Sequence, residues 1–150
     1  MAAGDVRVLD NASVSLGGKD VSAYVASCRL HVTNPPVSVP NTFGRAGPLR
    51  EVSDKYDWML DIEFVTDGWG ATELDGIMTA MLKPPLGSGS GRIACIIKPD
   101  GGTTGTTNPS YTGTAILNEW EPLGSSGAIN EAVRQTRTFQ GAGDLAKATA

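Results

Sequence analysis

Residues 55–67, KYDWMLDIEFVTD, alternate apolar and polar side chains with the period of two that is typical of a β-strand. Every second position belongs to an apolar ladder: Trp58, Leu60, Ile62 and Phe64. The other face carries a row of carboxylates, here called the acidic row: Asp57, Asp61, Glu63 and Asp67. A strand of this kind buries one face, which predicts a β protein built in layers. The acidic row is either an ordinary solvated face or a face that must repel something, such as passing nucleic acid.

Length and composition limit the size of the fold and its partners. The chain has 150 residues, the size of one domain, and its 19 Gly and 9 Pro in short clusters predict many turns. It has 12 Lys and Arg against 16 Asp and Glu, a net charge of −4. The basic residues are scattered along the chain, which argues against a surface that grips nucleic acid.

The other periodic segments predict a single domain that is mainly β, a β-sandwich or partial barrel with one flanking α-helix. Further strands are expected at residues 6–10, 12–16, 23–32, 92–98, 111–121 and 131–140. The helix is expected at residues 71–83, where apolar residues recur at three-and-four spacing before two prolines stop it. Thr72 followed by Asp75 resembles a capping box for this helix, and Asp67 is the alternative, as the cap of an earlier start. Residues 141–150 are expected to form a short flexible tail.

Residues 37–54 are the leading candidate for a contact element. They are rich in Pro and Gly and are longer than a tight hairpin needs, so we expect an extended loop. Loops of this length in a compact domain are usually functional or disordered. The side chains singled out in it are Asn41, Phe43, Arg45, Leu49, Arg50 and Glu51.

Groups that could catalyse a reaction are sparse. The single histidine, His31, lies on the polar side of its strand without a partner motif, so we expect a surface histidine. Cys28 and Cys95 are expected to be buried, reduced thiols, and two cysteines with one histidine make a poor zinc set. We therefore expect no enzyme activity, no catalytic residue, no cofactor and no bound metal.

The start of the chain indicates where the protein is kept. Residues 1–8 carry charge and lack the apolar run of a signal peptide. No stretch is long and apolar enough to span a bilayer. We expect a protein that is made and kept in a reducing cytosol.

Several phrases in the chain resemble the major tail protein, or tail tube protein, of long-tailed bacteriophages. They run in order through most of its length: KDVSAYVASCRL, DGWGATELDGIMTAML, NPSYTGTAILNEWEP and TRTFQGAGDL, with the long loop and the acidic strand after the first. The resemblance implies a β-sandwich with a flanking helix that assembles into hexameric rings stacked into a tube. It also implies that one sheet lines the lumen and that the long loop reaches the adjacent ring.

The same resemblance implies partners and a location. The partners are other copies of the chain, other tail proteins and a tape-measure protein, while phage DNA passes through without specific binding and no membrane is involved. The location is the virion tail, assembled in the host cytoplasm. The acidic row is the candidate lumen lining because carboxylates repel phosphate. Ring size and the sheet face that turns inward stay open, since inner and outer faces are both polar.

Alternatives remain open. Another virion protein of the head–tail junction or a decoration protein would share the fold without forming tubes. A small β-sandwich that binds carbohydrate or protein would use its tryptophans for stacking: Trp58, Trp69 and Trp120. A hydrolase would need an acid pair, Asp61 with Glu63 or Glu119 with Glu121, although carboxylates at this spacing are common on solvated strands.

Overall fold

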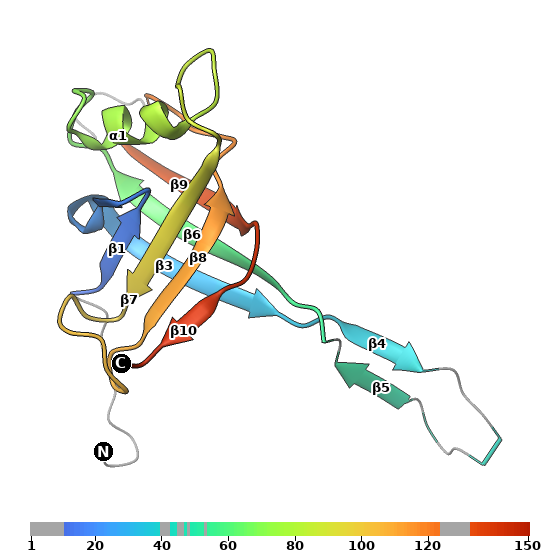
Figure 1. The fold of residues 1–150 in the computed structure, drawn as a ribbon. Coiled ribbons are helices and arrows are strands. Elements are labelled where there is room, and N and C mark those ends of the chain that lie inside the picture. Colours follow the sequence, from blue (N-terminus) through green and yellow to red (C-terminus); the bar gives the residue numbers. More distant parts are fainter. Residues whose placement is uncertain (1–10, 40–42, 45–46, 48, 53, 124–132) are drawn as a thin grey trace.

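A computed structural model of the chain describes residues 11–39, 43–44, 47, 49–52, 54–123 and 133–150 (Figure 1). The strands in this part are β1 Ser13–Leu16, β2 Lys19–Asp20, β3 Val25–Thr33, β4 Pro36–Val39, β5 Leu49–Val52, β6 Asp57–Val65, β7 Arg92–Lys98, β8 Ser110–Ile116, β9 Arg134–Gly141 and β10 Ala146–Ala148. A short 3-10 helix, Ser22–Tyr24, and the α-helix α1, Leu74–Met81, complete the described elements. The prediction of a mainly β fold with one α-helix is confirmed.

The main sheet is antiparallel and has the order β2-β1-β7-β8-β9-β6-β3, with β10 paired to β8. β8 is where this sheet changes direction, because it pairs with β7 along its length but meets β9 only at Ala115 and Ile116. The part with β1, β7 and β8 therefore crosses over the part with β9, β6 and β3, as Figure 1 shows. The two parts form an open sandwich rather than a closed barrel, since β2 and β3 end the strand order without pairing to each other.

The core lies between these two parts of the sheet. β6 alternates as its sequence predicts, and the whole apolar ladder is buried at 2% exposure or less: Trp58, Leu60, Ile62 and Phe64. Phe64 makes edge-to-face ring contacts with Trp120 and Phe139, at centroid distances of 5.4 and 6.2 Å. β1, β7 and β8 close the core from the other side with Leu16, Ile93, Cys95 and Ala115.

Helix α1 covers one end of the sandwich with its apolar stripe. Leu74 and Met78 are fully buried in the core. The helix is shorter at both ends than the range 71–83 expected from the sequence. At its start, Asp67 Oδ1 accepts a hydrogen bond from the backbone N–H of Leu74 at 3.3 Å. Asp67 therefore satisfies one of the backbone donors that the first turn of a helix leaves without an intrahelical partner.

The long loop expected at residues 37–54 contains a β-hairpin instead. β4 pairs with β5 in the register Pro36 to Val52 and Val39 to Leu49, and the pair continues outward from the β3–β6 pair. Figure 1 shows it projecting away from the sandwich; we call residues 36–52 the arm. The sequence did not indicate this pair of strands within the expected extended loop, because the apolar alternation at Val37 and Val39 is short and surrounded by Pro and Gly.

The expectation of a flexible tail at residues 141–150 was also wrong, because this segment contains the paired strand β10. β10 pairs with β8 at Ser110–Thr112, which is the part of β8 that β9 leaves open. Leu145 packs against the core, and its backbone N–H donates to the Tyr56 hydroxyl at 2.9 Å. A chain end with one apolar anchor and a free strand edge beside it gains enough contacts to be ordered. The strand expected at residues 6–10 lies outside the described residues.

Candidate functional site

The sheet face opposite the core, here called the outer face, is the first candidate surface. It is built from alternate residues of β3, β6 and β9, which the strand register places side by side. On β6 these are Asp57, Met59, Asp61, Glu63 and Val65; on β3, Ser27, Arg29, His31 and Thr33; on β9, Arg134, Thr136, Thr138 and Gln140. Three members of the acidic row therefore do share one face.

The neighbouring strands change the charge of that face. Asp61 lies directly opposite Arg29 on β3, and on β9 it accepts a hydrogen bond from the Thr138 hydroxyl at 2.5 Å. Glu63 forms an ion pair with Arg134, whose Nη1 lies 3.7 Å from Glu63 Oε1. The outer face is consequently a mixture of carboxylates, arginines and hydroxyls, and the acidic row runs through it beside cations.

Asp67 does not belong to this face. β6 ends at Val65, and Asp67 lies in the following turn, where it accepts the hydrogen bond from Leu74. Burial raises the pKa of Tyr24, and the charge and hydrogen bond of Asp67 add to this effect. Asp67 therefore holds the start of α1, and the row shortens to Asp57, Asp61 and Glu63.

His31 is part of the outer face as the sequence predicts. Its two ring nitrogens lie 3.3 Å from the Arg29 guanidinium and 2.9 Å from the Thr33 hydroxyl. Both neighbours lie on the same strand, two residues away. This arrangement joins the polar row of β3 into a chain of side-chain contacts on the surface.

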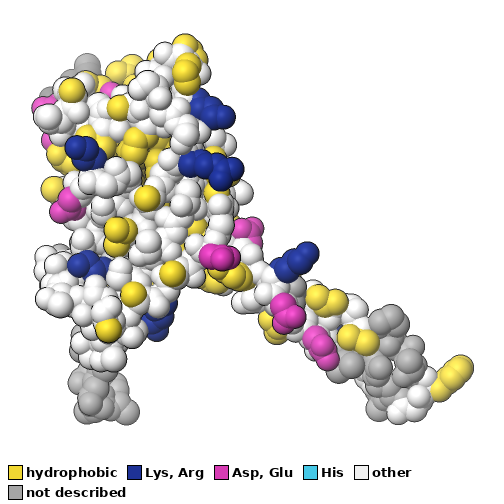
Figure 2. All heavy atoms as spheres, in the orientation of Figure 1, with side chains coloured by type: hydrophobic (Ala, Val, Ile, Leu, Met, Phe, Trp, Pro, Cys, Tyr) yellow, Lys and Arg dark blue, Asp and Glu magenta, His cyan; other side chains and the backbone are white. Residues whose placement is uncertain are grey.

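The arm is the second candidate surface, and it is unusually apolar for a projecting hairpin. Val37 is 49% exposed, Val52 is 70% exposed and Phe43 at the turn is fully exposed. Figure 2 shows these apolar side chains along the arm together with carboxylates. Arg50 and Glu51 are exposed on β5, whereas Asn41, Arg45 and the side chain of Leu49 lie outside what the structure describes.

The third candidate is the free edge of β3. β3 ends the strand order, so over its nine residues the edge that faces away from β6 has no strand partner in the described part of the chain. A long edge with unpaired backbone groups invites pairing with another chain. The opposite end of the sheet is the two-residue strand β2.

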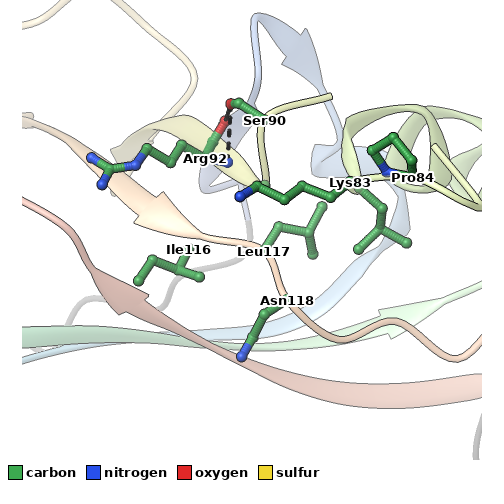
Figure 3. Close-up of a pocket in the computed structure, with 9 residues that line it drawn as sticks. Lys83, Pro84, Ser90, Arg92, Ile116, Leu117 and Asn118 are labelled. Carbon is green, nitrogen blue, oxygen red and sulfur yellow. Dashed lines mark hydrogen bonds between the residues drawn. The ribbon is translucent and has the colours of Figure 1, made fainter. Parts of the chain in front are cut away.

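Sequence reasoning missed a cleft at the end of the molecule that α1 covers (Figure 3). Its volume is about 460 Å³, and it is lined by residues from the end of α1, the start of β7 and the end of β8, among them Lys83, Arg92, Ile116 and Leu117. No sequence signal could have found it, because these positions are distant in the chain and have no shared motif.

The thiols and the buried polar side chains described next pack in or against the core. Cys28 and Cys95 are free thiols, and burial raises their pKa values to about 11 and about 12. The indole N–H of Trp120 donates to buried Asp75 Oδ1 at 2.9 Å, which ties α1 to the segment after β8. In the described residues, no group of three or more His, Cys, Asp or Glu side chains could hold a metal ion. No described helix has the length and apolar character needed to cross a membrane.

Comparison with known proteins adds no relative. No model of a protein family matches the chain, and no curated protein matches it. The surfaces that remain as candidates are the outer face, the arm, the β3 edge and the cleft.

Proposed function

We propose that this chain is a structural protein whose copies associate through the arm and the sheet edge. The particular assembly that we propose is the tail tube of a long-tailed bacteriophage, made of stacked hexameric rings through which DNA passes. The resemblance of the sequence phrases to tail tube proteins supports this assembly. We assign the chain no catalytic role and no cofactor.

The arm is the observation that carries the proposal. A two-stranded hairpin on its own is marginally stable in water, because it lacks a second layer to cover its side chains. Here the arm leaves the sandwich and exposes Val37, Val52 and Phe43. Apolar side chains on a projecting element are stabilised when another surface covers them, and further copies of the chain are the partner that a tube supplies.

The β3 edge supports a second, independent contact. Pairing the β3 edge of one copy with the β2 and β1 end of the next would continue the sheet from copy to copy and remove the free edges. A contact between two different surfaces closes into a ring when the rotation allows it. A tube needs one such closing contact and a second contact that propagates along its axis. The β3 edge supplies the closing contact, and the arm supplies the axial one.

The outer face is the candidate lumen lining. Its hydroxyls and carboxylates offer phosphate little attraction, and the two arginines on it lie beside Asp61 and Glu63. Because Arg134 is ion-paired with Glu63 and Arg29 lies opposite Asp61 in the strand register, the face offers DNA no cluster of cations away from carboxylates. In the proposed tube the other partners are further tail proteins and a tape-measure protein, and the location is the virion.

Two alternatives are distinguished by particular residues and by assembly. A ligand-binding module that stacks on tryptophan has little to offer here, because Trp58 and Trp120 are 2% and 8% exposed and only Trp69 is half exposed. A different virion protein with the same fold would associate with its neighbours without forming tubes. Tube formation by the purified chain therefore separates the tail tube from this second alternative.

The test is assembly of the purified protein, followed by sedimentation velocity at rising concentration and by negative-stain microscopy. We expect rings and tubes from the wild-type chain. Phe43→Ser with Val37→Ser should abolish tubes while the thermal unfolding curve stays that of a folded domain, since both side chains are exposed. Leu123→Ser is the matched control, because Leu123 is 73% exposed but lies outside the arm. A wild-type chain that stays monomeric at every concentration and salt level would refute the proposal.

A further inference from the structure

The cleft and the arm lie at opposite ends of the molecule. Figure 1 shows α1 at one end of the molecule, together with the start of β7 and the end of β8, which line the cleft. The arm extends away from the opposite end. If the arm of one copy contacts a surface at the opposite end of the next copy, the contact cannot close on itself within a pair. It repeats from copy to copy and propagates along a line.

The cleft is a preformed cavity with fixed walls. The backbone N–H groups of Gly89 and Gly91 donate to the carbonyls of Leu82 and Met81 at 2.9 and 3.3 Å, and the Leu117 N–H donates to the Gly91 carbonyl at 2.8 Å. These bonds tie the loop after α1 to β8. Gly91 has φ +74°, and the Lys83 side chain passes across it, as shown by the Lys83 Cγ at 3.5 Å from where a Cβ would lie. A cavity that is already formed loses little conformational entropy when a partner enters.

The cleft combines an apolar wall with a cationic rim. Ile116 is 39% exposed and forms the wall beside buried Leu117. Lys83 and Arg92 both line the cleft, and Figure 3 shows the two extended side chains on the same side of Ile116 and Leu117. Among the residues that the structure describes, neither cation has a carboxylate within ion-pair distance. A partner that fits this cleft presents an apolar side chain next to a carboxylate.

One face of the arm has this combination. The β4–β5 register places Val37 directly opposite Glu51 and puts Val39 on the same face. Val37 and Glu51 are both exposed. The other face carries Arg50 and Val52, so a cation takes the place of the carboxylate there. The Val37 and Glu51 face is therefore the one whose charge complements the rim of the cleft.

We propose that the Val37 and Glu51 face of the arm docks in the cleft of a second copy, with Glu51 between Lys83 and Arg92 and with Val37 on Ile116. This inference rests on the proposed function and names the receptor for its axial contact. The dominant stabilisation is burial of Val37 and Ile116, and the charges select the face and the direction of the arm.

Charge reversal with rescue tests the contact. Lys83→Glu with Arg92→Glu should reduce tube length or number by about tenfold or more, because the rim then repels Glu51. Glu51→Lys alone should have the same effect, and combining it with the two cleft substitutions should restore tubes. Lys147→Glu is the control, since it reverses an exposed cation on β10 away from the cleft. Rings should still form in all these variants.

Cross-linking gives a second readout that does not depend on charge. In tubes of Val37→Cys with Ile116→Cys, mild oxidation should join copies by disulfides, seen as a ladder on a non-reducing gel. Val37→Cys with Leu123→Cys should give none. Tubes of wild-type length and number in the cleft variants would overturn the cleft as the receptor while leaving the tube intact. A cross-link from Val37→Cys to native Cys28, in place of one to Ile116→Cys, would have the same meaning. A wild-type chain that forms no tubes would overturn both the function and this contact.

Discussion

Two free thiols show at the residue scale how packing against the core changes the pKa of a side chain. Cys95 is fully buried on β7, and its Sγ lies 3.7 Å from the Ile93 carbonyl. Cys28 is half-buried on β3, and the Asp61 carboxylate adds to the effect of burial on its pKa. Burial disfavours the thiolate, which is the form that reacts with disulfides and alkylating agents. In the folded chain the thiolate form of both cysteines is therefore disfavoured.

The raised pKa values predict slow thiol chemistry. The pKa of Cys28 is about 11 against an ordinary 9.0, so at pH 8 its thiolate fraction is roughly a hundredfold lower than in the unfolded chain. We expect the native protein to react with a disulfide reagent at least that much more slowly than the protein in urea. Cys28→Ser isolates Cys95, which should react more slowly still. Equal rates in the native and unfolded protein would show that burial does not protect the thiols.

The same shifts link thiol ionisation to stability. Folded pKa values above 9.0 mean that the folded chain binds more thiol protons than the unfolded chain from pH 9 up to about 11 for Cys28 and about 12 for Cys95. This contribution to the free energy of unfolding is fully present below pH 9 and is lost as the pH rises through that window.

At the scale of elements, Trp58 holds three strands together. Its indole N–H, from β6, donates to the Gly143 carbonyl between β9 and β10 at 2.8 Å. The ring occupies space that two glycines leave free. A Cβ on Gly113 of β8 would lie 2.7 Å from Trp58 Cζ2, and one on Gly141 of β9 would overlap the indole directly. The glycines are needed here for close approach rather than for backbone freedom.

We therefore predict that Gly141→Ala destabilises the fold by about 1–3 kcal/mol, the usual cost of overpacking a filled core. Gly105→Ala is the matched control, because a Cβ there has no neighbour within 4 Å, and it should change stability by less than about 0.5 kcal/mol. Urea unfolding followed by tryptophan fluorescence measures both. If the two variants unfold at the same urea concentration, the close packing of Trp58 against Gly141 is not what the structure indicates.

At the scale of the whole molecule, the position of the outer face in the assembly decides what its charges do. Asp61 and Glu63 point away from the buried ladder, and the Glu63–Arg134 pair is well exposed, with side chains 34% and 60% accessible. Exposed ion pairs contribute about 0–1 kcal/mol, so Asp61→Asn with Glu63→Gln should leave both folding and assembly intact. This neutral pair is the control for a charge reversal.

We predict that Asp61→Lys with Glu63→Lys makes tubes that hold or slow DNA. The reversal removes the carboxylate opposite Arg29 and the Glu63 ion pair of Arg134, and it adds two cations beside them. Phosphates in a narrow channel would then be attracted along its wall. The measurement is genome delivery by otherwise intact particles. Delivery equal to that of the neutral control would place this face outside the lumen, and the tube itself could still be correct.

Local periodicity was enough to predict the strand β6 and the helix α1 from the sequence. The ladder from Trp58 to Phe64 is buried as predicted, and Leu74 and Met78 form the inner stripe of a real helix. A period of two or of 3.6 is a property of neighbouring residues, so it predicts a strand or a helix without knowledge of the rest of the chain. The mainly β class followed from the same signal.

Contacts between residues that are distant in the chain became known from the folded structure. It paired β4 with β5 where the sequence predicted a loop, and it placed β10 on β8 where a flexible tail was expected. It also set Arg29 beside Asp61, took Asp67 out of the acidic face and brought Lys83 and Arg92 to one cleft. The physical reason is that strand register and packing depend on the whole chain, whereas a sequence pattern specifies only which face of one element is apolar.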